Sequence, residues 1–278
     1  MTDEATAFVP GHVTGFFTSD PAEDPTKAGS RGGGIALADG VTVTVSARQD
    51  RSVTLNGVDI EIEAVDRVLD ALRADAAVQA ETPLPLGAGF GVSGAMALGT
   101  ALGTNAVRGR GLSENELVTI AHGAEVQAGT GLGDVVAQAR GGVPLRLEPG
   151  GPQDNYIDAI PARGRVEYHV IDELSTEDVL GGDTDMLTQA GERALSQVVR
   201  EPTTGTFVRA ARQFAREAEL LTDDVQAVLE DVAAADGEAS MAMLGETVFT
   251  LGTGLTDAGY DASVTEIHPG GATLVDGA

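Results

Sequence analysis

The chain has 278 residues, and its 17 lysines and arginines face 43 aspartates and glutamates, which gives a formal net charge of −26. A surface this acidic repels phosphate backbones and anionic lipids, so binding to nucleic acids or membranes is excluded as the main function. The sequence contains no cysteine, which excludes disulfides, thiolate metal sites and a cysteine nucleophile.

The composition also predicts where the protein works. The N-terminal stretch MTDEATAFVP lacks the basic and apolar segments of a signal peptide, and no stretch approaches the ~18 apolar residues of a membrane span, so we expect a cytoplasmic protein. Strong acidity with a single lysine, Lys27, suits a protein that stays hydrated in concentrated salt, where charge repulsion is screened. We therefore expect a halophilic source.

Local patterns predict the elements of the first half of the chain. Valines alternate with Thr and Ser in one strand, Asn56-Gly57 is typical of a tight hairpin turn, and two prolines make residues 81–86 a loop. A helix of small residues follows this loop, and its glycines each cost roughly 1 kcal/mol relative to alanine, which indicates close packing. Ser113 and Glu116 form a capping box that begins the next helix. The predicted elements are strands 41–46, 52–55 and 58–62, a helix around 65–72, helices 91–107, 113–128 and 134–139, and a strand 143–147.

The turn-rich segment 148–154 predicts a boundary between a domain of residues 1–150 and a domain of residues 151–278. The second half alternates strands with helices, which predicts a second α+β layer beside the first. Its predicted elements are strand 166–171, helices 185–199, 206–221 and 223–235, and strands 246–250, 263–268 and 272–275. Thr176 is expected to cap a helix.

The most informative segment is a glycine-rich loop before the small-residue helix. It consists of Gly87, Ala88, Gly89, Phe90, Gly91, Val92, Ser93 and Gly94. Its backbone amides and the positive end of the helix dipole favour a bound phosphate, and the alternative is a tight turn with close helix packing. The G-x-G-x-x-G match at residues 89–94 lacks the hydrophobic strand of a dinucleotide fold, because Pro83 and Pro85 stand there. A P-loop is excluded because the only lysine is followed by Ala28.

Three motifs in order resemble the GHMP kinase superfamily. They are PGHVTGFF at residues 10–17, the glycine-rich loop, and AEVQAGTGLGDVVAQARGG at residues 124–142, and they are most similar to the archaeal pantoate kinase branch. The resemblance implies an α+β GHMP kinase fold, with an N-terminal domain like domain 2 of ribosomal protein S5 and a ferredoxin-like C-terminal domain. The segment 241–249 stands at the place of the third family motif with one glycine, and its contact with nucleotide is left open.

The resemblance also implies a chemistry, namely transfer of a phosphate from ATP to pantoate to give 4-phosphopantoate in archaeal coenzyme A biosynthesis. The glycine-rich loop would hold the phosphates of ATP, and Mg²⁺ would be bound by the hydroxyl of Ser93 and the carboxylate of Glu125. Asp134 would orient the acceptor hydroxyl and take its proton, or act only through its charge.

Pantoate carries a carboxylate, so its pocket needs a cation. Arg146 is the first candidate and Arg31 the second, since arginine binds a carboxylate through two hydrogen bonds, although both could instead pair with surface acids. His122 lies three residues before Glu125 on the same helix face and is a substrate-contact candidate, as is Ser30. The alternatives for these two are a structural histidine and a turn serine.

Two other functions remain open. The chain could be another GHMP kinase, acting on mevalonate, shikimate or homoserine, or it could be a nucleotide-binding sensor without catalysis. Many small cytosolic enzymes form dimers with twofold symmetry, so we expect a homodimer. His12 and Thr14 of the first motif are expected near the pocket, and His169 and His268 are expected to be structural.

Overall fold

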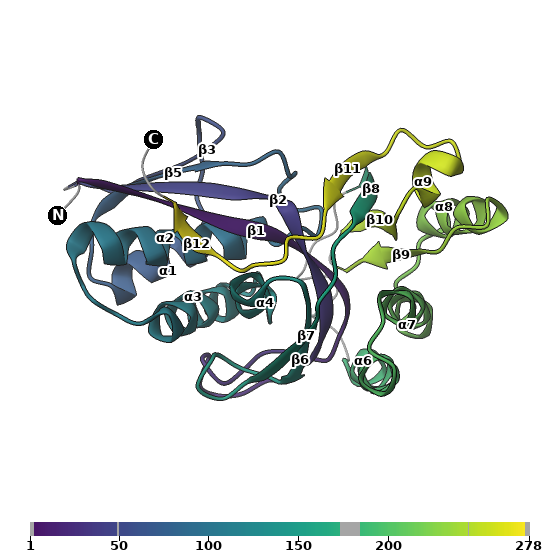
Figure 1. Cartoon of the computed structure of the whole chain (residues 1–278). Coiled ribbons are helices and arrows are strands. Elements are labelled where there is room, and N and C mark those ends of the chain that lie inside the picture. Colours follow the sequence, from purple (N-terminus) through teal and green to yellow (C-terminus); the bar gives the residue numbers. More distant parts are fainter. Residues whose placement is uncertain (1–2, 49, 173–183, 244, 276–278) are drawn as a thin grey trace.

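The computed structural model describes residues 3–48, 50–172, 184–243 and 245–275, and these form two β-sheets with helices packed against them (Figure 1). Within this described part, the first sheet has eight strands in the order β12-β1-β2-β5-β3-β4, with β6 paired to β2 and β7 paired to β6. Its strands are β1 (Glu4–Phe17), β2 (Gly32–Ala47), β3 (Ser52–Leu55), β4 (Val58–Asp59), β5 (Ala76–Glu81), β6 (Val143–Glu148), β7 (Tyr156–Ile160) and β12 (Thr273–Val275).

Four helices of the N-terminal half lie along one face of this sheet (Figure 1). They are α1 (Glu63–Ala71), α2 (Val92–Arg108), α3 (Glu114–Ala128) and α4 (Asp134–Arg140). Helix α2 is central and packs on β1 and β2. A Cβ on Gly99 would lie 2.5 Å from Cγ2 of Val43, and one on Gly103 would lie 2.6 Å from Cγ2 of Val45. The glycines of this helix therefore let its backbone lie directly on the valines of β2.

The second sheet has four strands among the described residues, in the order β11-β8-β10-β9. Its elements are β8 (Arg165–Asp172), α6 (Asp185–Arg200), α7 (Thr204–Glu217), α8 (Asp223–Ala234), β9 (Ala239–Ala242), β10 (Glu246–Leu251), α9 (Gly254–Asp257) and β11 (Ser263–Glu266). Numbered along the chain, these strands lie in the order 4-1-3-2, with helices between the first and second and between the third and fourth, which is the ferredoxin-like arrangement. The predicted α+β class is confirmed.

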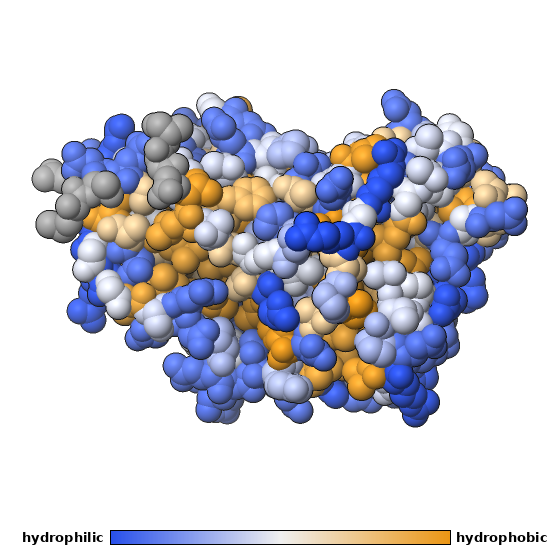
Figure 2. All heavy atoms as spheres, in the orientation of Figure 1, coloured by the Kyte–Doolittle hydropathy of each residue, from blue (hydrophilic) through white to orange (hydrophobic). Residues whose placement is uncertain are grey.

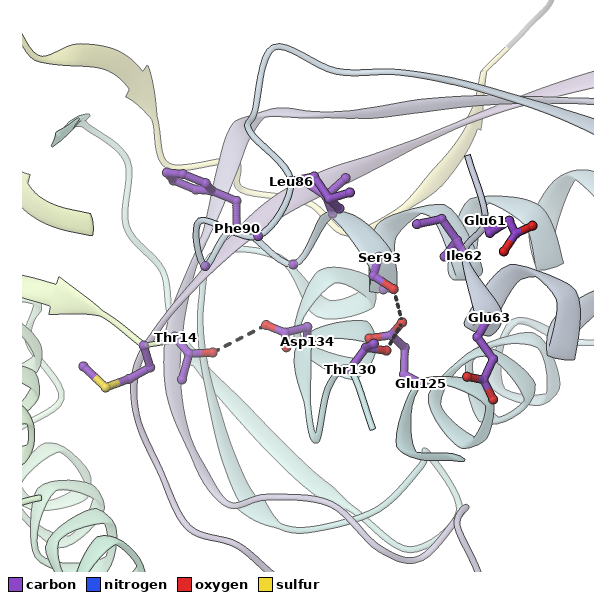
Figure 3. A pocket seen from close by; sticks show the side chains of 16 residues that line it. Thr14, Glu61, Ile62, Glu63, Leu86, Phe90, Ser93, Glu125, Thr130 and Asp134 are labelled. Atoms are coloured by element: carbon purple, nitrogen blue, oxygen red, sulfur yellow. Dashed lines mark hydrogen bonds between the residues drawn. The ribbon is translucent and has the colours of Figure 1, made fainter. Parts of the chain in front are cut away.

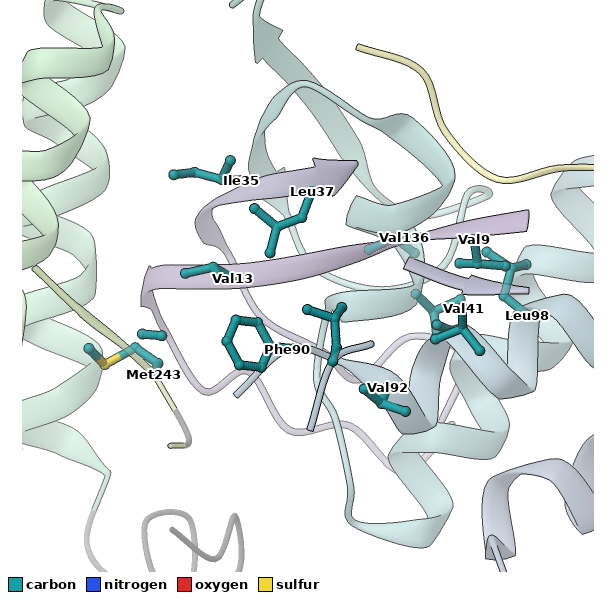
Figure 4. Packing of buried hydrophobic residues seen from close by; sticks show 14 of the residues in the cluster. Val9, Val13, Ile35, Leu37, Val41, Phe90, Val92, Leu98, Val136 and Met243 are labelled. Atoms are coloured by element: carbon teal, nitrogen blue, oxygen red, sulfur yellow. The ribbon is translucent and has the colours of Figure 1, made fainter. Parts of the chain in front are cut away.

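The two halves share one apolar core. Phe90, in the loop before α2, is buried in it, and its ring lies 4.7 Å from that of Tyr168 in β8. Figure 4 shows Phe90 among side chains of β1 and β2, with Met243 of the C-terminal half nearby. The loop before α2 is thus anchored to both sheets.

Most predicted elements are confirmed, with corrections at their ends. The strand predicted at 58–62 ends at Asp59, because Ile62 turns inward as the N-cap of α1. The helix predicted at 206–221 instead runs from Thr204 to Glu217. The capping box of α3 is present as predicted. The predicted cap Thr176 lies outside the described residues.

The boundary predicted near residue 150 falls in the turn between β6 and β7. These two strands pair with each other in the first sheet, and β12 returns to the same sheet to pair with β1. The division into residues 1–150 and 151–278 therefore stays a prediction, and the first sheet draws strands from both ranges.

One face of the molecule combines hydrophilic and hydrophobic residues. Figure 2 shows mostly hydrophilic residues along its outline, and hydrophobic residues interspersed with a few strongly hydrophilic ones across its middle. Across the described ranges, no helix combines the length and apolarity that crossing a bilayer requires.

Candidate active site

A cavity of about 410 Å³ lies where the glycine-rich loop, the start of α2 and the start of α4 meet (Figure 3). This size suits a nucleotide-sized ligand. Its lining comes from β1, the segment before α1, the glycine-rich loop, the end of α3, the start of α4 and the segment after β9. The lining residues are Thr14, Glu61, Ile62, Glu63, Leu86, Gly87, Gly89, Phe90, Gly91, Val92, Ser93, Gly94, Glu125, Thr130, Asp134 and Met243.

The glycine-rich loop has the conformation that an anion site needs. Gly87, Gly89 and Gly91 have φ angles of 83°, 85° and 64°, in the positive-φ region that glycine adopts readily and other residues disfavour. Helix α2 begins at Val92, and its N-cap, Gly91, supplies no side-chain hydrogen bond. The first amides of a helix have no acceptor within it, so these face the cavity with the positive end of the helix dipole. The loop fits the phosphates of a nucleotide.

Three contacts hold the loop from behind. The amide of His12 donates to the carbonyl of Phe90 at 3.0 Å, and the side-chain amide of Gln138 donates to the carbonyl of Gly91 at 2.9 Å. From the C-terminal half, the hydroxyl of Thr247 donates to the carbonyl of Ala88 at 2.9 Å. The glycine at 245 is also required, because a Cβ there would overlap the Ala88 peptide. The segment 241–249 therefore supports the loop.

Ser93 and Glu125 lie together at the start of α2, as the resemblance implies. The hydroxyl of Ser93 donates to Oε1 of Glu125 at 2.6 Å, and the hydroxyl of Thr130 donates to the same oxygen at 2.9 Å (Figure 3). Burial raises the pKa of Glu125 to about 7, although both hydroxyls act against this rise. The carboxyl is thus ready to lose its proton when a cation binds.

This pair fits a magnesium ion shared with phosphate oxygens. Mg²⁺ prefers hard oxygen ligands and keeps several waters, so one hydroxyl and one carboxylate beside a phosphate loop suffice. Nowhere in the described ranges do three His, Asp or Glu side chains form a cluster that could hold a metal alone. A metal here would therefore depend on the nucleotide for its remaining ligands.

Asp134 is the first residue of α4 and points into the cavity (Figure 3). Its Oδ1 accepts from Nδ1 of His12 at 2.7 Å and from the hydroxyl of Thr14 at 3.5 Å. Burial acts to raise the pKa of Asp134, but the hydrogen bond from His12 and the charge of Arg146 hold it below its ordinary value. Asp134 is therefore a carboxylate at neutral pH, able to accept a hydrogen bond or a proton.

Arg146 lies on the other side of Asp134, in a small adjoining cavity. That cavity is lined by Thr14, Phe17, Ser30, Leu132, Gly133, Asp134 and Arg146. Arg146 is 2% exposed, and its guanidinium donates from Nη2 to the hydroxyl of Ser30 at 3.2 Å and leaves Nη1 without a partner among the described residues. Burial lowers the pKa of Arg146 while Asp134 acts to raise it. A buried cation with an unused donor is a ready site for an anionic group.

The other two substrate candidates have structural contacts. His122 is buried, and its Nε2 donates to the carbonyl of Ala28 at 2.8 Å, so it fixes the turn that carries Ser30 and does not itself line either cavity. Arg31 is an ion-pair residue, with Nη2 2.9 Å from Glu192. Pairing with a surface acid is the alternative role that the sequence analysis gave for Arg31.

Sequence reasoning missed several residues of the site. Thr130 and Gln138 escaped notice, although each had a signal: Thr130 lies in the glycine stretch after Glu125, and Gln138 lies one helical turn after Asp134. Ile62 and Leu86, which form an apolar wall of the larger cavity, carry no sequence signal at all. They become neighbours only through the fold.

Comparisons with known proteins agree with this geometry. The family of GHMP kinases N terminal domains matches residues 59–142. The chain is 34% identical to a pantoate kinase of Methanocaldococcus jannaschii, over 88% of this chain and 91% of that one, and 33% identical to a pantoate kinase of Methanospirillum hungatei, over 98% and 96%. A solved phosphotransferase related to the CoA biosynthesis pathway superposes with a TM-score of 0.87 at 29% identity, covering 98% of each chain.

Proposed function

We propose that this chain, which belongs to the pantoate kinases of the GHMP kinase superfamily, transfers the terminal phosphate of ATP to pantoate and yields ADP and 4-phosphopantoate. This reaction is a step toward coenzyme A. The coverage of the matches supports the assignment, because they extend over both halves of the chain and most of the length of the relatives.

The observation that carries the proposal is the pairing of the two cavities through Asp134. The larger cavity offers the uncapped start of α2, which suits phosphates. The smaller one, which at about 10 Å³ has room for about one water molecule, offers the unpaired Nη1 of Arg146 as a contact for a carboxylate that enters from the larger cavity. Asp134 and Thr14 line both. A small hydroxy acid with its carboxylate on Arg146 would present its hydroxyl between Asp134 and the phosphates.

The residues divide the work of phosphoryl transfer among them. The amides at the start of α2 hold the phosphates in line, and Ser93 and Glu125 would hold Mg²⁺, which when bound supplies positive charge to the phosphate oxygens. Arg146 and Ser30 orient the acceptor. Asp134 accepts the proton as the hydroxyl oxygen bonds to the γ-phosphorus and the bond from that phosphorus to the β-phosphate oxygen breaks. A role for Asp134 through charge alone is the alternative.

Two other functions are tested by the same assay. The test is ADP release in concentrated salt with ATP and Mg²⁺, comparing pantoate with mevalonate, shikimate, homoserine and no acceptor. We expect turnover with pantoate alone. Turnover with another alcohol would show that the chain is a GHMP kinase with a different substrate. No ADP release with any acceptor, from protein shown to be folded, would favour a nucleotide-binding sensor.

An Asp134→Asn variant is the control for a contaminating kinase. It retains the size of the side chain and removes the carboxylate, so turnover should fall at least about 10²-fold while ATP binding persists. Wild-type turnover in this variant would remove Asp134 from the mechanism.

The setting of the enzyme is proposed from its composition. An acidic chain with one lysine suits the cytoplasm of a halophilic archaeon, and small enzymes of this kind commonly form homodimers. Light scattering coupled to gel filtration in concentrated salt measures the oligomeric state, and a monomer at micromolar concentration would contradict the homodimer.

A further inference from the structure

His12 is a buried side chain that the chemistry above does not yet use. It lies in β1 and is 0% exposed, and its Nδ1 is 2.7 Å from Oδ1 of Asp134, which is 122 residues away in the chain. The pairing of β1 with β2 is irregular on both sides of His12, between Pro10 and Gly11 and between Thr14 and Phe16. These irregularities interrupt a long regular strand pair where it passes the site.

The facing strand leaves room for the ring of His12. A Cβ on Gly34 of β2 would overlap Nε2 and Cε1 of His12, so only glycine allows the imidazole to lie there. Two strands are therefore shaped around one histidine, which holds its ring against Asp134 with little freedom to rotate.

The contacts of His12 settle where its proton lies. Burial lowers the pKa of His12, although the carboxylate of Asp134 opposes the shift, so the ring is neutral at neutral pH. A neutral ring carries one proton, and a nitrogen 2.7 Å from a carboxylate oxygen must be the donor, so the proton is on Nδ1. Nε2 is buried without a partner among the described residues. The other polar contact of the ring in this part of the chain is with the hydroxyl of Thr14, which lies 3.4 Å from Nδ1 and also contacts Asp134.

The two oxygens of Asp134 are consequently unequal. Oδ1 accepts from His12 and from the hydroxyl of Thr14. No hydrogen bond to Oδ2 is found in the described part of the chain. A Cβ on Gly131 would lie 3.3 Å from Oδ2 of Asp134 and 2.7 Å from Oε2 of Glu125, so Oδ2 lies on the side of Glu125, one of the two proposed magnesium ligands. The oxygen without a hydrogen bond among the described residues is therefore the one on the side of Glu125.

We propose that His12 is a positioning residue for phosphoryl transfer: its Nδ1–H occupies Oδ1 of Asp134 and fixes the carboxylate so that Oδ2 receives the proton of the acceptor hydroxyl. The hydroxyl O–H bond breaks toward Oδ2 while the acceptor oxygen bonds to the γ-phosphorus and ADP leaves. His12 itself neither gains nor loses a proton, and it touches no reacting atom. This inference rests on the proposed kinase function.

The test compares two amide replacements of the same ring. The side-chain nitrogen of asparagine in His12→Asn comes close to the place of Nδ1, and that of glutamine in His12→Gln comes close to the place of Nε2, away from Asp134. We expect kcat of His12→Gln to fall about 10²-fold below that of the wild type, since a misplaced catalytic group costs about this much. We expect kcat of His12→Asn to be at least about tenfold higher than that of His12→Gln. KM for ATP should change less than about threefold in both, because neither replacement reaches the start of α2.

Controls separate the possible failures. His169→Ala replaces a strand histidine that stacks on Tyr260, and it should leave kcat unchanged. Thermal unfolding and equilibrium binding of an ATP analogue confirm that each His12 variant is folded. Equal kcat in the asparagine and glutamine variants, whether both impaired or both normal, overturns the role of His12. Wild-type protein without pantoate-dependent turnover overturns the kinase function, and the His12 proposal fails with it.

Discussion

At the scale of single residues, Glu125 links the proposed metal site to the stability of the fold. Its pKa rises from an ordinary 4.5 to about 7, so the folded protein binds this proton more tightly than the unfolded chain does. The proton's contribution to stability is full below pH 4.5 and is lost as the pH rises toward 7 and beyond. The difference corresponds to on the order of 3 kcal/mol.

Glu125→Gln should remove this dependence, because glutamine has the shape of the protonated carboxyl and does not ionise. Between pH 5 and pH 8, without metal or nucleotide, the wild type should lose on the order of 3 kcal/mol of unfolding free energy relative to the variant. Denaturant titrations at fixed salt measure this. Glu61→Gln, which alters an exposed carboxyl on the same cavity, serves as the control. Parallel stability curves for wild type and Glu125→Gln would contradict the assigned environment.

Gly133 lies against Arg146 and Ser30, the two side chains proposed to orient the acceptor. A Cβ there would lie 2.5 Å from Nε of Arg146 and 2.6 Å from Oγ of Ser30, so both side chains would have to move. Gly133→Ala should therefore raise KM for pantoate about tenfold or more and leave KM for ATP nearly unchanged.

Steady-state kinetics with each substrate varied in turn measure the effect of Gly133→Ala. Gly205→Ala is the matched control, since its new Cβ would lie 3.3 Å from the flexible end of Arg209 on α7, away from both cavities. An equal rise in both KM values would show that the substitution disturbs the whole site and not the arginine alone.

The sequence could name candidate residues of the site but not the contacts between them. Ser93, Glu125 and Asp134 were named from motifs that resemble those of the GHMP kinases, and the structure brings all three to one cavity. The contact of His12 with Asp134 spans 122 residues, and no local spacing encodes it. The same holds for Arg146 and Ser30, 116 residues apart, whose meeting depends on the pairing of β2 with β6.

At the scale of the elements, α2 shows a local preference overruled by packing. Alanine favours a helix interior over glycine by roughly 1 kcal/mol, so Gly99→Ala should stabilise the isolated helix. In the fold, the new Cβ would lie 2.5 Å from Cγ2 and 2.7 Å from Cβ of Val43. Overpacking of a tight core typically costs about 1 to 3 kcal/mol, which exceeds the gain.

We therefore expect Gly99→Ala to lower the unfolding free energy by about 1 to 2 kcal/mol net. Denaturant titration measures it. The double variant Gly99→Ala with Val43→Ala is the control, because removing the valine branches makes room for the new methyl group. The packing explanation predicts that the two substitutions together cost less than the sum of their separate costs. If the costs of the two substitutions were additive, overlap with Val43 would not be the cause of the destabilisation.

The helices with a clear local signal were predicted from sequence. Helix α3 was recognised from its capping box and α2 from its run of small residues after the glycine-rich loop. Strand β1 was not, because Pro10-Gly11 interrupts it and nearly all of its second half is buried, so polar and apolar residues do not alternate. Strands β5, β7 and β9 are short, between four and six residues, and strands of this length give too few positions for an alternating pattern to be recognised.

At the scale of the whole molecule, the net charge of −26 sets a condition for folding. Like charges repel in the compact state, and screening weakens the repulsion as the Debye length falls from about 10 Å at 0.1 M salt to about 3 Å at 1 M. The melting temperature should therefore rise with potassium chloride, steeply at first, and level off near 1 M. Differential scanning fluorimetry or circular dichroism across this range measures it.

Two salts distinguish screening from a general strengthening of apolar burial. Potassium sulfate is excluded from protein surfaces and stabilises burial beyond its effect on charge, whereas potassium chloride acts mainly by screening. If repulsion among the acidic residues dominates, the two salts should raise the melting temperature alike when compared at equal ionic strength below about 1 M. Stabilisation by sulfate alone would place the salt requirement in the small-residue core, where α2 lies on β2, and not in the acidic surface. A melting temperature indifferent to both salts would contradict a halophilic adaptation, because a charge of this size would then be balanced within the fold itself.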